Sequence, residues 1–134
     1  MESSRYSKAR RLLHILWALA AVVVIVGSLL PSDSPTIKAL DALPISDKID
    51  HLAAYAALAF LPAIHEKWRF TFAAALGALA LGVALEYVQR YSGVRDFEVG
   101  DMVADAAGVC VGLAAGALLR PTRLVRAIRF GKFG

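Results

Sequence analysis

Four long runs of apolar residues alternate with short polar segments along this chain of 134 residues. The runs cover residues 12–30, 52–64, 70–85 and 102–119, and the only Asp, Glu, Lys, Arg or His residues inside them are His14 and Asp105. Apolar residues fill each run on every side, whereas in the helices of soluble domains they mark one face. A helix of about 20 residues crosses a hydrocarbon core of roughly 30 Å. The pattern therefore predicts four transmembrane helices, near residues 12–30, 47–64, 69–91 and 101–119.

Composition supports a membrane protein. Hydrophobic residues make up 58% of the chain and charged residues 19%, whereas an average soluble domain has roughly 45–50% and 25%. We expect an all-α, polytopic membrane protein whose four helices form an antiparallel bundle over residues 12–119. A basic N-terminal segment, 1–11, and a basic tail, 120–134, would flank this domain. The single cysteine, Cys110, excludes a disulfide framework and a thiolate metal cluster.

The first apolar run has a second interpretation. Arg5, Lys8, Arg10 and Arg11 precede it, as the basic region of a cleaved signal peptide would. The run is longer than the apolar region of most signal peptides, however, and no good A-x-A cleavage site follows it. We therefore favour an uncleaved signal anchor.

Charges are distributed unequally between the two predicted sides of the membrane. With the N-terminus inside, the inner segments hold 11 Lys and Arg residues and 2 acidic residues. The outer half holds 4 Lys and Arg residues and 9 acidic residues. The inner side is then 11 − 2 = +9 and the outer side 4 − 9 = −5, which adds to the net charge of +4. By the positive-inside rule, both termini are expected to be cytoplasmic.

The tail has a basic residue at every third position from Arg120 to Lys132, with apolar residues between them. Such a segment beside a membrane helix suits anionic lipid headgroups. We expect membrane lipids and no nucleic acid as its partners, because the membrane surface already supplies the negative charge.

Polar residues gather near the predicted outer ends of three helices. Asp47, His51 and Tyr55 are spaced four apart and share one face of the second helix, and Asp101 and Asp105 do the same on the fourth. A charge at the membrane centre costs roughly 2.5–3.5 kcal/mol, so intramembrane charges usually face the interior of a bundle. We therefore predict a shared, outward-facing polar site made of Asp47, His51, Tyr55, Glu86, Gln89, Arg95, Asp101 and Asp105.

Simpler roles stay open for these residues. Asp47 and Asp101 stand at helix starts, where a carboxylate caps free N–H groups. Tyr55 could be an aromatic anchor at the membrane interface. His51, Glu86, Arg95 and Asp105 could form a structural salt-bridge network between helices.

A stripe of small residues continues the Asp105 face of the fourth helix through Gly108, Gly112 and Gly116. Glycines at this spacing let another helix backbone approach closely. They could pack inside the monomer or form the seam of a homo-oligomer.

The set of polar residues resembles the VanZ-like family of small bacterial membrane proteins. The family pattern is Asp-Lys-x-x-His, then Glu-x-x-Gln, then an Arg, a Phe-acid pair and Asp-x-x-x-Asn-x-x-Gly. This chain has, over roughly residues 44–119, "DKIDH" from Asp47, "EYVQ" from Glu86, "RDFEVGD" from Arg95 and "DAAG" from Asp105. It departs from the pattern at Asp105, where the family usually has Asn.

The resemblance implies a multi-pass protein of the bacterial inner, or cytoplasmic, membrane. The founding member of the family is associated with low-level resistance to the glycopeptide teicoplanin. The resemblance implies no established reaction.

As an enzyme, the site would rest on His51, Glu86 and Asp105, with His51 as a general base. The chain has no GxSxG signature and no Ser-His-Asp signature. A metal on His51, Asp101 and Glu86 would suit a divalent cation, but the spacing matches no standard metal motif. We therefore expect no metal and no cofactor.

As a binding module, the same site would receive a lipid-linked or amine-bearing ligand of the cell envelope. Arg95 could hold the phosphate or carboxylate of a lipid-linked cell-wall precursor. We favour this hypothesis over the enzyme and over a purely structural role.

Overall fold

The computed structural model describes residues 2–42 and 47–120 of the chain. The predicted basic tail from residue 121 onward lies outside the described residues. The helices are α1 (Glu2–Leu29), α2 (Pro35–Asp41), α3 (Asp47–His65), α4 (Trp68–Ser92) and α5 (Val99–Leu119). The described part of the chain has no strand, which confirms the all-α prediction.

Three of these helices are long and apolar enough to cross a membrane: the Ser7–Leu29 part of α1, α4 and α5. The predicted length and apolar character are therefore confirmed for these three helices. Helix α3 is not among them. It has the length, but Asp47, Lys48, Asp50 and His51 occupy its first turns, so its apolar part is only residues 52–64.

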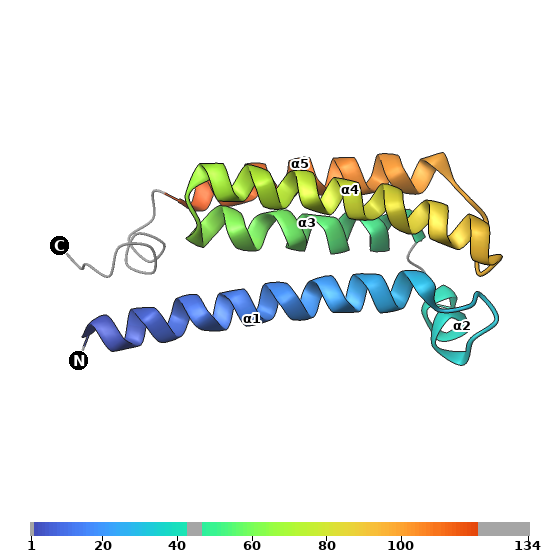
Figure 1. Ribbon diagram of the computed structural model, residues 1–134, viewed down its shortest axis with the longest axis horizontal. Coiled ribbons are helices and arrows are strands. Elements are labelled where there is room, and N and C mark those ends of the chain that lie inside the picture. The colour runs from blue at the N-terminus through green and yellow to red at the C-terminus, as the bar shows by residue number, and fades with distance from the viewer. Residues whose placement is uncertain (1, 43–46, 121–134) are drawn as a thin grey trace.

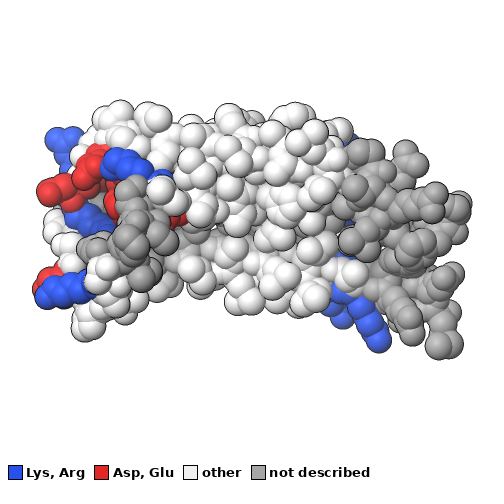
Figure 2. Space-filling view, turned by 180° about the vertical axis from the view of Figure 1, so that it is seen from behind, with Lys and Arg blue, Asp and Glu red and all other residues white. Residues whose placement is uncertain are grey.

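The four long helices lie alongside one another, and α2 lies at one end of them (Figure 1). The chain reverses direction from each long helix to the next, so α3 and α5 run the same way. Contacts between α3 and α5 are the most extensive of any pair, and α1 packs on α3 and α4. On the face seen in Figure 2, the charged side chains gather at the two ends and leave an uncharged band between them.

Helix α2 was not foreseen from the apolar pattern, because it is short and mostly exposed. It has an ordinary start signal: the N–H of Ile37 donates to Oγ of Ser34 at 3.3 Å, and Pro35 occupies the first helical position. Ile37 is buried.

The glycine stripe of α5 lies against α3. A Cβ atom added at Gly108 or Gly112 would overlap the carbonyl oxygens of Leu52 and Ala56, and one at Gly116 would overlap the side chain of Ala63. The absence of these Cβ atoms lets the two helices approach within backbone contact. Helix α3 therefore occupies this face within the chain, which is the first of the two alternatives considered above.

Helix α1 is joined to α3 by a hydrogen bond that depends on a proline. Pro62, in the last turn of α3, has no N–H to donate to the carbonyl of Leu58, four residues earlier. The indole N–H of Trp17 on α1 donates to this carbonyl at 2.9 Å. Away from water an unpaired carbonyl is costly. Trp17 therefore replaces the helical hydrogen bond that Pro62 removes.

Candidate functional site

The predicted polar residues meet at the end of the bundle where α3 and α5 begin, and an ion-pair network joins these two helices. The Lys48 ammonium lies 2.5 Å from both Glu98 Oε2 and Asp101 Oδ1. His51 Nδ1 lies 2.8 Å from Asp105 Oδ1, and its Nε2 lies 3.7 Å from Asp101 Oδ2. Asp101 and Asp105 are buried, and Lys48 and His51 on α3 are their partners.

Helix α4 contributes two buried polar side chains to the same end. Glu86 Oε2 accepts a hydrogen bond of 3.2 Å from the backbone N–H of Glu98, just before α5. Gln89 Nε2 donates to the carbonyl of Ser28 on α1 at 2.7 Å. Both side chains therefore join neighbouring elements.

Tyr55 is a buried residue of this site and not an interfacial anchor. It is 2% exposed, and its ring is parallel to that of His51, with centroids 6.5 Å apart. Gly82 on α4 makes room for it: a Cβ there would lie 3.1 Å from the Tyr55 hydroxyl and 2.6 Å from Asp105 Oδ2. Tyr55, Gly82 and Asp105 thus meet where α3, α4 and α5 converge.

Two adjoining cavities open at this end, one of about 150 Å³ and one of about 240 Å³. The first lies between α1 and α3 and has an apolar wall and a polar rim. Val23, Val24, Ile37 and Ala54 are on its apolar side, and Asp47, Asp50, His51, Tyr55 and Arg95 are among its polar residues. The second is mainly polar and includes Gln89, Arg95, Asp96, Glu98 and Asp101.

Asp47 and Arg95 line both cavities. Among the described residues, the Arg95 guanidinium has no hydrogen bond or ion pair, and neither has the Asp47 carboxylate. The two cavities therefore share one cationic and one anionic side chain that make no hydrogen bond or ion pair with another described residue.

The structure thus brings the eight predicted residues to one end of the bundle, where six of them line the cavities and two do not. Asp47, His51, Tyr55, Gln89, Arg95 and Asp101 line the cavities, whereas Glu86 and Asp105 lie buried behind them. Asp101 is an ion-pair partner, and the N-cap residue of α5 is Glu98.

The residues that could hold a metal ion at this end of the structure differ from the set considered in the sequence analysis, which was His51, Asp101 and Glu86. One ligand atom each from Asp47, His51 and Asp101 lies within 4.8 Å of the others, and Glu86 is not part of this group. The Lys48 ammonium already contacts Asp101 here. A metal ion that binds Asp101 would therefore compete with a cation of the chain itself.

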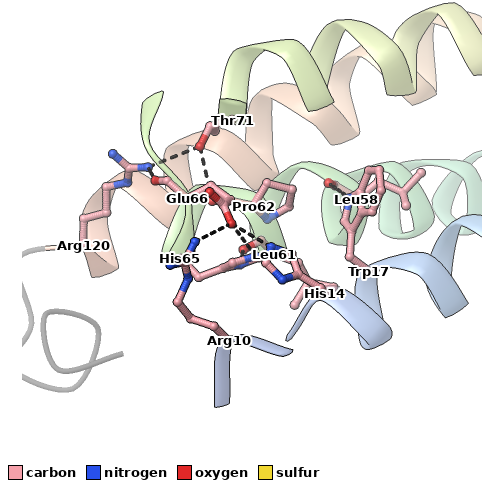
Figure 3. A network of polar contacts seen from close by, with 10 residues as sticks. All are labelled: Arg10, His14, Trp17, Leu58, Leu61, Pro62, His65, Glu66, Thr71 and Arg120. Atoms are coloured by element: carbon pink, nitrogen blue, oxygen red, sulfur yellow. Dashed lines mark hydrogen bonds and ion pairs between the residues drawn. The ribbon is translucent and has the colours of Figure 1, made fainter. Parts of the chain in front are cut away.

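The sequence analysis did not include Lys48 and Glu98 among the site residues, although both lie in the quoted motifs. It also missed a second polar group at the opposite end of the bundle, shown in Figure 3. We call this group the His65 network; its members are Arg10, His14, His65, Glu66, Thr71 and Arg120. The available signal was that His14, His65 and Arg120 all fall at the predicted inner ends of helices.

Arg120 holds the end of α5 against the loop between α3 and α4. Its Nε donates to the carbonyl of Ala63 at 2.5 Å, and its terminal nitrogen donates to the carbonyl of Glu66 and to Thr71 Oγ1. The guanidinium also lies 3.6 Å from the centroid of the Trp68 ring. This residue, assigned from the sequence to a lipid-facing tail, is therefore buried in the bundle.

Glu66 is the acceptor at the centre of the network. His14 Nε2 lies 2.7 Å and an Arg10 terminal nitrogen 3.1 Å from its Oε1. Burial opposes ionisation of this carboxyl, but the hydrogen bonds from His14 and Arg10 outweigh it and lower the pKa of Glu66 below its ordinary value.

Comparison of the chain with protein-family models, with curated proteins and with solved structures gives no match. The VanZ-like resemblance therefore rests on the motifs of the sequence alone.

Proposed function

We propose that this protein is a VanZ-like integral membrane protein of the cell envelope that binds an amphiphilic envelope ligand at the end of its helices. In this proposal α3 crosses the membrane with α1, α4 and α5, so that the four helices form an antiparallel bundle. Both termini are cytoplasmic, and the cavities face outward. On the face seen in Figure 2, an uncharged band lies between the charged side chains at the two ends, which supports this placement.

The observation that carries the proposal is the pair of cavities that share Asp47 and Arg95. An amine fits Asp47 and Asp50, and a phosphate or carboxylate fits the Arg95 guanidinium. An acyl or polyprenyl chain fits the apolar wall formed by Val23 and Val24 on α1. The combination suits a lipid-linked cell-wall precursor or an amine-bearing lipid.

We propose binding, and we assign no reaction to the site. The VanZ-like resemblance extends the proposal to glycopeptide (teicoplanin) tolerance as a phenotype to test.

The test is native mass spectrometry of the purified chain in mild detergent, offered phosphatidylethanolamine or a polyprenyl phosphate. We expect the wild type to retain lipid and Arg95→Gln to lose the phosphate-bearing ligand. Arg90→Gln is the matched control, because Arg90 is exposed on α4, contacts Phe97 and lines neither cavity. Equal retention by the two variants, or no retention by the wild type, would contradict the proposal. Teicoplanin susceptibility of a deletion strain complemented with each variant gives the cellular readout.

A structural role is the second candidate, and the Lys48 and His51 contacts between α3 and α5 favour it. In that case, Lys48→Gln and His51→Gln lower the melting temperature, and the purified wild-type protein retains neither phosphatidylethanolamine nor the polyprenyl phosphate.

A further inference from the structure

The end of the bundle opposite the two cavities brings together three side chains with the chemistry of metal ligands. His14 comes from α1, His65 is the last residue of α3, and Glu66 follows it. One ligand atom from each lies within 4.8 Å of the others. We propose that His14, His65 and Glu66 form a binding site for a divalent transition metal ion of the Zn²⁺ class.

The distances fit such an ion. Zn²⁺ is bound by His nitrogen and carboxylate oxygen at about 2.0–2.2 Å, so tetrahedral ligand atoms lie roughly 3.4 Å apart. His14 Nε2 lies 2.7 Å and His65 Nε2 3.6 Å from Glu66 Oε1. The first distance must lengthen by about 0.7 Å, and the two histidine nitrogens lie within 4.8 Å of each other, so side-chain shifts of about an ångström would bring the three atoms around one ion.

The proton positions on His65 point to a cation as its missing partner. Its Nδ1 contacts the carbonyl of Leu61, which can only accept, so Nδ1 carries the proton. In the neutral ring Nε2 then has a free lone pair, directed toward the Glu66 carboxylate. This Nε2 is buried, and among the described residues no group hydrogen-bonds to it. Two acceptors that face each other repel unless a proton or a metal ion lies between them, and a metal ion would satisfy both.

The contact with Leu61 also matches the way metal-binding histidines are held. Such histidines usually donate their second ring N–H to a carboxylate or a backbone carbonyl, which fixes the tautomer and the ring orientation. His65 is 3% exposed, so its ring has little freedom to turn.

The fourth coordination position is open to solvent. The His14 side chain is 54% exposed, and that of Glu66 is 16% exposed. Three protein ligands and one open position are typical of zinc sites that hold a water molecule. An ion could therefore enter without unfolding of the helices.

Two arginine side chains lie near Glu66, and their positive charges lower the affinity of this site for a metal ion. Arg10 shares Oε1 of Glu66 at 3.1 Å and must move when an ion binds there, but its side chain is 45% exposed and can reach water. Arg120 contacts the Glu66 carbonyl and leaves its carboxylate available. A bound ion would fasten α1, whose membrane-spanning part is not buried in the bundle, to the end of α3.

The test uses the full chain in detergent with a purification tag that contains no histidine. The metal-stripped protein is titrated with Zn²⁺ by calorimetry and with Co²⁺ by visible absorption. We expect one Zn²⁺ per chain, Co²⁺ bands of tetrahedral type, and a loss of affinity of at least tenfold in both His14→Gln and His65→Gln. Arg10→Gln should bind more tightly than the wild type, because it removes a competing cation.

His51→Gln is the control variant, because it removes the histidine of the other candidate group and leaves this one intact. It should bind Zn²⁺ as the wild type does. His14 is exposed, so its variant keeps the test valid even if His65→Gln misfolds. Absence of binding by the wild type, unchanged binding in His14→Gln, or a loss confined to His51→Gln would overturn the proposal. Because the two sites lie at opposite ends, lipid retention and metal binding fail or succeed independently.

Discussion

The indole nitrogen of Trp17 lies 2.9 Å from the carbonyl oxygen of Leu58, the one carbonyl of α3 that Pro62 leaves without its usual helical donor. This hydrogen bond joins α1 to the core of the other three helices, where Trp17 also packs against buried residues. It is one of the contacts that join α1 to the bundle, together with the bond from Gln89 to Ser28 and the contacts of His14 and Arg10 with Glu66.

We expect Trp17→Phe to lower the free energy of unfolding in detergent by roughly 0.6–1.7 kcal/mol, the range of hydrogen bonds between membrane helices. In a Pro62→Ala background the loss should be smaller, because the N–H of residue 62 would then serve the Leu58 carbonyl. A double-mutant cycle measured by chemical unfolding tests this coupling. The same loss in both backgrounds would show that Pro62 and Trp17 act independently.

The contact between α3 and α5 depends on the glycines of α5. We expect Gly112→Ala to destabilise the protein by about 1–3 kcal/mol, because its Cβ would overlap the Ala56 carbonyl. Gly77→Ala on α4 is the control, since no atom lies within 4 Å of its added Cβ. The control should be neutral or stabilising, because Ala is the better helix former. Equal unfolding transitions, followed by circular dichroism, would contradict the close packing.

Cysteine labelling tests whether α3 crosses the membrane. In a Cys110→Ser background, single cysteines replace three exposed residues: Thr36 on α2, Lys67 between α3 and α4, and Asp96 between α4 and α5. We expect an impermeant maleimide to label the cysteines at 36 and 96 in spheroplasts, and the one at 67 only after the membrane is opened. Labelling of positions 36 and 67 from the same side would show that α3 does not cross.

The four long helices and their approximate bounds could be predicted from the sequence, because an apolar run and a period of four residues are local properties. For the same reason, the sequence predicts that Asp47, His51 and Tyr55 share one helix face. It also predicts that the polar residues gather at one end of the bundle. The short helix α2 and the extension of α1 to Glu2 carry weaker local signals, since neither is apolar.

Only the tertiary structure decided which groups are partners. Lys48 pairs with Glu98 and Asp101, and His14 meets His65 and Glu66, across about fifty residues of chain. The spacing of residues along a helix sets the face on which each side chain lies, but it does not determine which helix that face meets. This choice follows from how closely the helices pack. Because the glycines of α5 admit the backbone of α3, His51 and Lys48 reach the carboxylates of α5, and Glu86 is left to accept the N–H of Glu98.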